Sequence, residues 1–317
     1  RTLPLMEEAR AWMLANGAVA LPEIVLVERR AGGGLVERAL LDALLGQTGA
    51  LARSALRQAQ RVAHLRGEIE TLRTVKASLD RFIGDVATIV AEVEREQGLT
   101  KHIGISVDEW NVWRTTQFNQ VDKEPLLTGP WRFHPRIIED EYTATDAVVV
   151  GSLVNALLRH ADRVKIANQA QLVNVIAPIR SEEGGPAWKQ SIFHPFAIAA
   201  AHAHGDVIAL DVDAPVLATR SHGEVPSLDA AATRTDDGVE LFLANLQTEH
   251  DVEVTLDVDG YVAFAATTVG APDGGDRLTT NTEASQPVQP RALAIVEGAS
   301  SITLPALSWN HVRLRPV

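Results

Sequence analysis

The sequence predicts an α/β part followed by an all-β part. Between about residues 78 and 205, predicted helices alternate with short apolar strands, which is the pattern of a parallel sheet. From Asp206 onward, apolar residues recur at every second position between turn signals such as Asp236-Asp237-Gly238, which is typical of an antiparallel β-sandwich. A change in charge and aromatic content near residue 77 separates both parts from the segment before them.

Composition excludes several classes of function. The chain has 317 residues, a net charge of −12 and no cysteine, so disulfides, thiolate zinc sites and cysteine nucleophiles are excluded. The acidity disfavours binding to a phosphate backbone, and no apolar run reaches the roughly 18–20 residues of a membrane helix. We therefore expect neither a nucleic-acid nor a membrane partner. No signal segment follows Arg1, so we expect a cytoplasmic location.

Residues 1–77 differ from the rest of the chain. They hold 11 Lys or Arg against 8 Asp or Glu, which gives +3, whereas the following residues give −15. Trp12 is their only aromatic residue. The stretch from Leu35 to Thr74 is rich in Ala, Leu, Arg, Glu and Gln, which favour helices. We predict a mostly helical segment over residues 1–77, next to domains at 78–205 and 206–317.

The α/β part begins with a predicted helix over Leu79–Gln97 that ends at Gly98. Its expected apolar face consists of Phe82, Val86, Ile89, Val90 and Val93. The other elements predicted in this part are, in order, a strand over His102–Val107, a helix over Ile137–His160, a strand over Asp162–Asn168 and a helix over Ile192–His204.

The all-β part is predicted from runs with a period of two residues, which places alternate side chains on opposite faces of a sheet. The clearest runs are Val239–Ala244, Val252–Val258 and Ser301–Leu304. The strand faces hold few residues suited to chemistry, so we expect this domain to pack beside the α/β part.

The strongest candidate site follows the first strand, where Asp108-Glu109 precedes Trp110 and Trp113. Adjacent strand residues point to opposite faces, so only one of the two carboxylates enters a pocket directly. A carboxylate between tryptophans suits sugar chemistry, because aromatic rings stack on sugars and a carboxylate stabilises an oxocarbenium-like centre. The alternative is an acidic pair that caps a loop beside packing tryptophans. In a (β/α)₈ barrel, the loops after the strands form the catalytic face.

Several ordered segments of residues 78–317 resemble glycoside hydrolase family 51, the α-L-arabinofuranosidases. Ile105–Trp113 is similar to the family's nucleophile segment, and Ser78–Ile83 to the helix before that strand. The similar segments that follow are Leu158–Lys165, Ala170–Ile179, Gly184–Trp188, Phe193–Phe196, Leu228–Ala230 and Leu304–Asn310. The resemblance implies the C-terminal part of a (β/α)₈ TIM barrel, followed by a jelly-roll-like β-sandwich.

The resemblance also implies a retaining hydrolase that releases terminal arabinofuranose from arabinan or arabinoxylan oligosaccharides. Glu109 would be the nucleophile, Trp113 would line the sugar subsite, and Gln171 would hydrogen-bond the sugar or hold Glu109. An endoglucanase or β-xylosidase specificity is the alternative within this enzyme class. The resemblance implies a homo-oligomer, and we expect no cofactor and no metal ion.

One family motif is missing from the sequence. The family's acid/base glutamate lies in a Gly-Asn-Glu segment, which this chain lacks. None of the glutamates before Ser78 matches it: Glu7, Glu8, Glu23, Glu28, Glu37, Glu68 and Glu70. A second hypothesis therefore stands beside the enzyme: a non-catalytic truncated or rearranged family member that at most binds sugar, through Trp110, Trp113 and Gln171.

Two histidines near the end of the last predicted helix are candidate metal ligands. His202 and His204 are two residues apart, and residues at this spacing do not share a helical face. We therefore predict that they cap the C-terminus of the helix rather than bind zinc.

Overall fold

The computed structural model describes residues 69–114, 118–119, 123–131, 133, 137–296 and 298–317. The chain divides into two compact units, Arg1–Glu68 and Ile69–Val317. All the described residues belong to the second unit. The helical prediction for residues 1–68 lies outside them.

A long helix covers residues 69–96 and runs through the position near residue 77 where composition changes. Its packed face is not the one predicted. Leu72 and Ile83 are buried, and Val75 and Leu79 pack beside them against the core. Phe82, Ile89 and Val93, which the sequence suggested as the apolar face, are exposed. The helix has two apolar faces, and the described residues cover only the Leu72–Ile83 face.

A parallel strand pair lies beside this helix. Strand β1 covers Ile105–Trp110, helix α5 covers Ala144–Arg159, and strand β2 covers Val164–Gln169. β1 and β2 pair in parallel, from Ile105 opposite Val164 to Trp110 opposite Gln169. This is the predicted strand–helix–strand order, although β1 begins and ends about three residues later than expected. Among the described residues the pair has no third strand.

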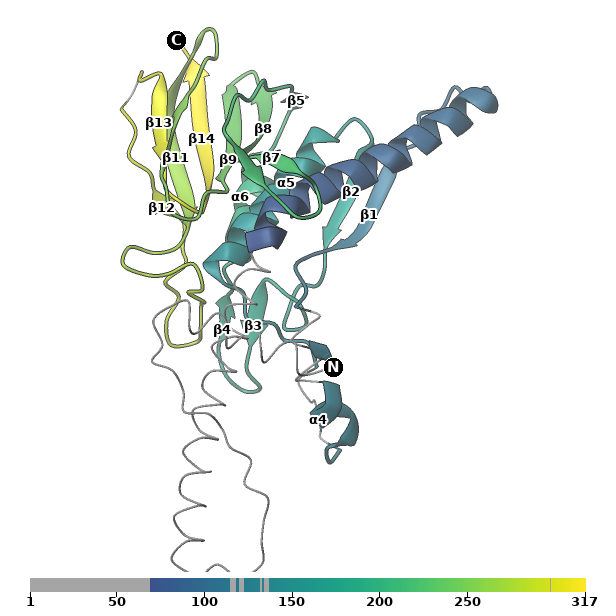
Figure 1. The fold of residues 1–317 in the computed structure, drawn as a ribbon, viewed down its shortest axis with the longest axis vertical. Coiled ribbons are helices and arrows are strands. Elements are labelled where there is room, and N and C mark those ends of the chain that lie inside the picture. Colours follow the sequence, from purple (N-terminus) through teal and green to yellow (C-terminus); the bar gives the residue numbers. More distant parts are fainter. Residues whose placement is uncertain (1–68, 115–117, 120–122, 132, 134–136, 297) are drawn as a thin grey trace, which may run out of the picture. The chain divides into compact units, whose positions relative to one another are not determined.

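Helix α5 begins seven residues later than the predicted Ile137. A capping box sets its start, because the Thr143 hydroxyl accepts from the Asp146 amide and the Asp146 carboxylate accepts from the Thr143 amide. Nearly all of α5 is buried, which fits its position between the β1–β2 pair and the antiparallel strands (Figure 1).

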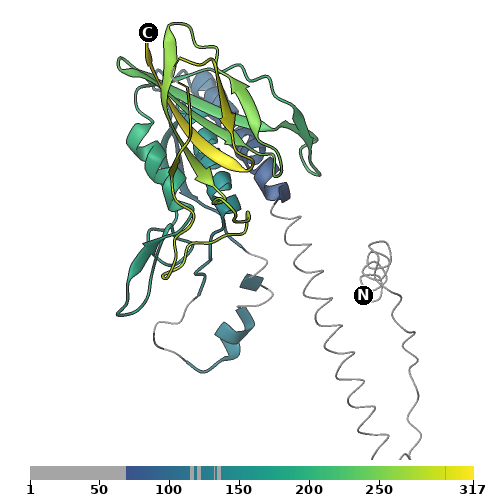
Figure 2. The same cartoon turned by 90° about the vertical axis from the view of Figure 1, so that its left-hand side faces the viewer.

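Short elements surround this core. Helix α6 covers Phe193–His202 and confirms the third predicted helix within two residues at its C-terminus. Helix α4 covers Lys123–Thr128, has no buried residue and stands apart from the sheets in both views (Figures 1 and 2). The two hairpins are β3 (Ile179–Ser181) with β4 (Ala187–Lys189), and β6 (Val216–Ala218) with β7 (Glu224–Pro226).

The C-terminal part is a β-sandwich, as the sequence predicted. Its main sheet has the strand order β12-β11-β14-β9-β8-β5 and is antiparallel. The bounds are β5 Asp206–Ile208, β8 Leu228–Thr235, β9 Gly238–Asn245, β11 Tyr261–Gly270, β12 Arg291–Ala292 and β14 Ser308–Pro316. The second layer is the antiparallel pair β10 (Val252–Thr255) and β13 (Ser301–Leu304).

The main sheet is buried on both faces. On β9, Leu241 and Leu243 belong to a core with Ile302 and Leu304 of β13. The intervening residues Phe242 and Ala244 belong instead to the core that contains α5. Because both faces are covered, β9 is buried almost throughout. It therefore does not show the alternation of buried and solvent-exposed residues that a sheet with one exposed face has.

Helix α5 contacts the sheet at a glycine. A Cβ atom on Gly151 would lie 2.2 Å from Cδ1 of Trp309, so only glycine allows this approach. One turn further along, the Trp309 indole donates to Oδ1 of Asn155 over 3.2 Å, and Trp309 stacks on Phe242.

A buried carboxylate joins three elements. Asp229 of β8 is 1% exposed and accepts from Asn155 (3.1 Å) and Arg159 (2.8 Å) of α5 and from Lys76 (3.3 Å) of the 69–96 helix. Arg159 also reaches Asp80 over 2.9 Å. Each charged side chain of this cluster therefore has a partner of opposite sign.

Within the part of the chain that the structure describes, no helix is both long enough and apolar enough to cross a membrane.

The first prediction concerns Gly151. We expect Gly151→Ala to lower the free energy of unfolding by about 1–3 kcal/mol, because the added methyl overlaps the Trp309 ring. Urea denaturation followed by far-UV circular dichroism measures it. Gly84→Ala is the matched control, since its Cβ meets no atom within 4 Å, and we expect it to stabilise the helix by about 0.5–1 kcal/mol. Equal stabilities for the two variants would contradict the packing argument.

The second prediction concerns His194 at the start of α6. Burial and then the nearby Lys189 charge lower the pKa of His194 to about 4. The unfolded histidine has a pKa near 6.5, so between pH 7 and pH 5 the unfolded chain gains a proton that the folded chain does not bind. We expect this site to remove about 2 kcal/mol of stability over that interval.

His194→Gln tests this pH dependence. Urea denaturation at pH 7 and pH 5 should show a loss of stability smaller by about 2 kcal/mol in this variant. His250→Gln, at an exposed position, should keep the loss seen with the unchanged chain. Identical pH dependence in all three proteins would contradict the assignment.

Candidate active site

The parallel pairing of β1 and β2 brings two predicted site segments to one edge. Trp110 at the end of β1 lies opposite Gln169 at the end of β2, and the Ala170 amide donates to the Trp110 carbonyl over 3.0 Å. Glu109 is therefore one residue before this pairing, and Gln171 is two residues after it. The carboxyl ends of parallel strands are the edge at which α/β proteins place their sites.

Both carboxylates at the end of β1 are exposed. The pairing with β2 shifts register between Val107 and Trp110, and this irregularity interrupts the alternation of faces. The expectation that only one of Asp108 and Glu109 enters a pocket directly stays a prediction. Asp108 accepts a hydrogen bond from the Ser106 hydroxyl, so its carboxylate is turned back along the strand. Within the part of the chain that the structure describes, no hydrogen bond or ion pair engages the Glu109 side chain.

The two tryptophans have different environments. Trp110 is only 8% exposed, and its ring packs against Phe196 of α6 with centroids 6.1 Å apart. Trp113 is 47% exposed and has its ring centroid 6.2 Å from that of Phe118. Trp110 is thus a core residue rather than a stacking surface, whereas Trp113 is an exposed aromatic residue.

Asn111 connects the loops after the two strands. Its amide nitrogen donates to the Ala170 carbonyl and, over 2.5 Å, to the Ile176 carbonyl. Its amide oxygen accepts from the Val112 amide over 2.9 Å. The backbone amide of Gln171 donates to the same Ile176 carbonyl over 3.3 Å. Asn111 therefore fixes the loop that contains Gln171 against the segment that contains Trp113.

A buried polar network supports the segment after Asn111. The Tyr142 hydroxyl donates to the Val112 carbonyl over 2.8 Å. Burial, followed by the charges of Asp140 and Asp146, raises the pKa of Tyr142, so this phenol stays protonated. Arg114 is held through its amide by Asp140 (2.9 Å) and through its guanidinium by Asp146 (2.6 Å). The backbone on both sides of Trp113 is thus anchored.

Sequence reasoning overlooked these supporting residues. Asn111 lies in the segment Ile105–Trp113, but the sequence assigns it no role, because its partners are carbonyls about 60 positions away. The capping box at Thr143 and Asp146 was readable, since it has the spacing that precedes a helix. The Tyr142 contact gives no local signal.

The residue types exposed at this edge of the sheet are those that sugar chemistry uses. Glu109 offers an exposed carboxylate, Trp113 an aromatic face, and Gln171 an exposed amide side chain next to the end of β2. This combination suits a glycoside, whose ring carbons stack on aromatics and whose anomeric carbon accepts a nucleophile.

Comparison with known proteins finds alpha-L-arabinofuranosidases. A family model described as the alpha-L-arabinofuranosidase C-terminal domain matches residues 108–308. A curated intracellular exo-alpha-(1->5)-L-arabinofuranosidase of Bifidobacterium longum is 38% identical over 253 residues, which cover 74% of this chain and 45% of the relative. A relative of the same description from Streptomyces lividans is 36% identical, covering 78% and 38%.

Solved structures agree as well. A family 51 alpha-L-arabinofuranosidase from B. longum superposes with a TM-score of 0.69 at 36% identity and covers 77% of this chain and 50% of that one. A family 51 arabinofuranosidase from Xanthomonas axonopodis pv. citri, at 24% identity and a TM-score of 0.61, shares the fold. The chain spans about half the length, or less, of the curated relatives it matches.

The third prediction concerns Asn111. We expect Asn111→Asp to lower the free energy of unfolding by about 1–3 kcal/mol, because the carboxylate cannot donate to the Ala170 and Ile176 carbonyls. Hydrogen exchange should show faster amide exchange over residues 170–177. Asn168→Asp, at an exposed position on β2, is the control and should leave both quantities unchanged. Unaltered exchange in Asn111→Asp would refute the anchoring role.

Proposed function

Because the chain belongs to glycoside hydrolase family 51, the α-L-arabinofuranosidases, we propose that it acts on terminal arabinofuranose units of arabinan and arabinoxylan oligosaccharides. The observation that supports this most directly is the position of Glu109, exposed at the carboxyl end of β1 and beside the end of β2. The relatives are named intracellular enzymes, and we propose the same location here. We also propose a homo-oligomer, which the family resemblance implies.

Glu109 is the proposed nucleophile of a retaining mechanism. Its carboxylate attacks the anomeric carbon, a covalent bond forms between Glu109 and the arabinosyl unit, and the bond to the leaving-group oxygen breaks. Water then attacks the anomeric carbon and releases arabinose with Glu109 regenerated. A retaining enzyme needs a second carboxyl group about 5–5.5 Å from the nucleophile to protonate the leaving oxygen and later to activate the water.

Trp113 and Gln171 complete the proposed sugar subsite. The exposed face of Trp113 stacks on the apolar face of the arabinofuranose ring. Gln171, directly after β2, hydrogen-bonds a sugar hydroxyl or orients the Glu109 carboxylate. Asn111 is a positioning residue for both, because it links the loops on which they lie.

The proposed site belongs to a (β/α)₈ barrel. Support comes from the parallel β1–β2 pair, from α5 as the crossover between them, and from apolar surfaces that the described residues leave uncovered. Phe82 and Ile89 of the 69–96 helix and Ile166 of β2 are more than half exposed. A barrel needs eight strands, so the others would have to come from outside the described residues.

A second candidate function is sugar binding without hydrolysis. The observation that favours it is the absence of a Gly-Asn-Glu segment from the 317 residues, which leaves the acid/base role unassigned. Loss of general acid help slows departure of a sugar leaving group by about 10²–10⁴-fold. An aryl leaving group departs without that help, so it separates the two functions.

The fourth prediction uses 4-nitrophenyl α-L-arabinofuranoside as the substrate. We expect the chain to release nitrophenol and to accumulate an arabinosyl adduct on the peptide containing Glu109, because water attack is slow without a general base. Stopped-flow absorbance and peptide mass spectrometry measure the two events. Glu109→Gln should abolish both, since an amide is not a nucleophile here.

Asp108→Asn is the matched control, because Asp108 is adjacent, also exposed and already accepts a hydrogen bond from the Ser106 hydroxyl. It should retain adduct formation. The binding function would be favoured over hydrolysis by two results together. No adduct forms, and the chain binds arabinose in a way that Trp113→Ala removes and Trp131→Ala does not. Trp131 suits that comparison because it is 84% exposed. Adduct on a residue other than Glu109 would refute the assigned nucleophile.

A further inference from the structure

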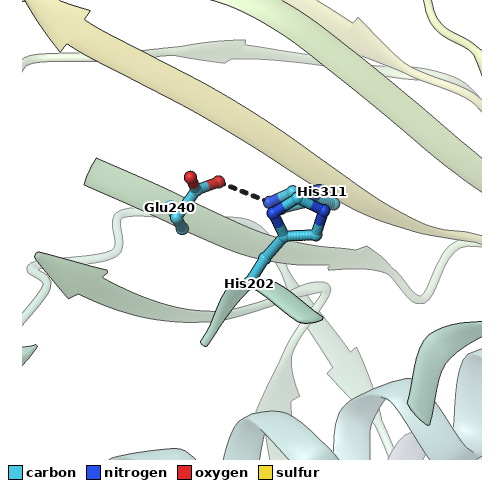
Figure 3. Close-up of side chains that lie close together, drawn as sticks. All are labelled: His202, Glu240 and His311. Atoms are coloured by element: carbon cyan, nitrogen blue, oxygen red, sulfur yellow. Dashed lines mark hydrogen bonds and ion pairs between the residues drawn. The ribbon is translucent and has the colours of Figure 1, made fainter. Parts of the chain in front are cut away.

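Three potential metal ligands converge away from the candidate active site, on the face of the main sheet that packs against the helices (Figure 3). His202 comes from the end of α6, Glu240 from β9 and His311 from β14. Glu240 pairs with Arg313 across the two strands, and His311 is two pairs further along, which places it on the same face. Three chain segments, of which the first and last are more than 100 residues apart, thus meet at one point.

The donor atoms lie close enough for a single ion. One ligand atom from each residue lies within 4.8 Å of the other two, and Nε2 of His311 is 2.6 Å from Oε2 of Glu240. The rings of His202 and His311 have centroids 4.5 Å apart. Tetrahedral zinc, with bonds of about 2.0–2.2 Å, holds its donors about 3.4 Å apart. Shifts of about an ångström in the side chains therefore suffice.

The surroundings orient the cluster. Oε1 of Glu240, the oxygen that faces away from His311, accepts from Arg313 over 3.3 Å. This fixes the carboxylate and leaves Oε2 directed at the histidines, as an outer-shell partner does in metal sites. His311 is buried and stacks on Phe242, with centroids 5.2 Å apart, so its ring is held in place.

The prediction that both histidines cap the C-terminus of the helix agrees with the position of His204 but not with that of His202. Nε2 of His204 bonds to the Ala201 carbonyl over 3.1 Å, as a C-terminal cap does. His202 instead points at the sheet, toward His311 (Figure 3). The i, i+2 spacing argues against a pair made by His202 and His204, but it could not reveal ligands from β9 and β14.

We propose that His202, Glu240 and His311 form a binding site for one Zn²⁺ ion. Two imidazoles and one carboxylate are a common zinc donor set, and water would complete four-coordination because His202 and Glu240 are only partly buried. The ion would join the C-terminus of α6 to β9 and β14. This site is separate from Glu109, so it does not depend on the proposed hydrolysis.

Calorimetric titration of the full chain with ZnCl₂, after dialysis against a chelator, tests the site. We expect one zinc ion per chain and a higher melting temperature with zinc than with chelator. His202→Ala and Glu240→Gln should each weaken binding at least about tenfold and remove the zinc-dependent rise in melting temperature. His204→Ala is the control and should bind zinc as the unchanged chain does.

Melting in chelator shows whether each variant folds. If His202→Ala does not fold, Glu240→Gln still tests the site, because glutamine keeps the shape of the glutamate side chain. Loss of binding in a variant that melts normally supports the site. Failure of the unchanged chain to bind zinc, or equal binding by His202→Ala and His204→Ala, would overturn it and leave Glu240–His311 as an ion pair.

Discussion

The close approach of α5 to the main sheet is the contact on which the described structure depends. Gly151 leaves room for the Trp309 indole, and Asn155 then binds that indole and the Phe242 carbonyl. A larger residue at position 151 would push the helix away from β14. Because α5 lies between β1 and β2 in the chain and against β9 and β14 in space, this one helix positions the candidate active site relative to the sandwich.

Buried charges reinforce the same helix from its other end. Asp229 is enclosed by Lys76, Asn155 and Arg159, which join β8 to α5 and to the 69–96 helix. Such a cluster adds little net stability when complete, but an unpaired member would be costly. It therefore favours one arrangement of the three elements. The sandwich thus supports helix α5, which lies between the strand that ends beside Glu109 and the strand that precedes Gln171.

The sequence predicted the elements better than their faces. The order of helices and strands was confirmed because hydrophobic period, caps and turn residues are local signals. The exposed face of the 69–96 helix was predicted wrongly, since Phe82, Ile89 and Val93 and the buried set with Leu72 and Ile83 both have helical spacing. Only the neighbouring elements decide between two apolar faces. For the same reason Trp110 and Trp113, three residues apart, could not be separated into a core and a surface residue.

By itself, the sequence determined the family and the β-sandwich, because both depend on ordered motifs and a two-residue period. Glu109, Trp113 and Gln171 stay predictions from the same motifs. Only the tertiary structure decided what lies beside them. Asn111 binds carbonyls beyond β2, and His202, Glu240 and His311 meet across more than 100 residues. Such convergence leaves no trace in local spacing, since it is produced by strand register and helix packing, which act between segments distant along the chain.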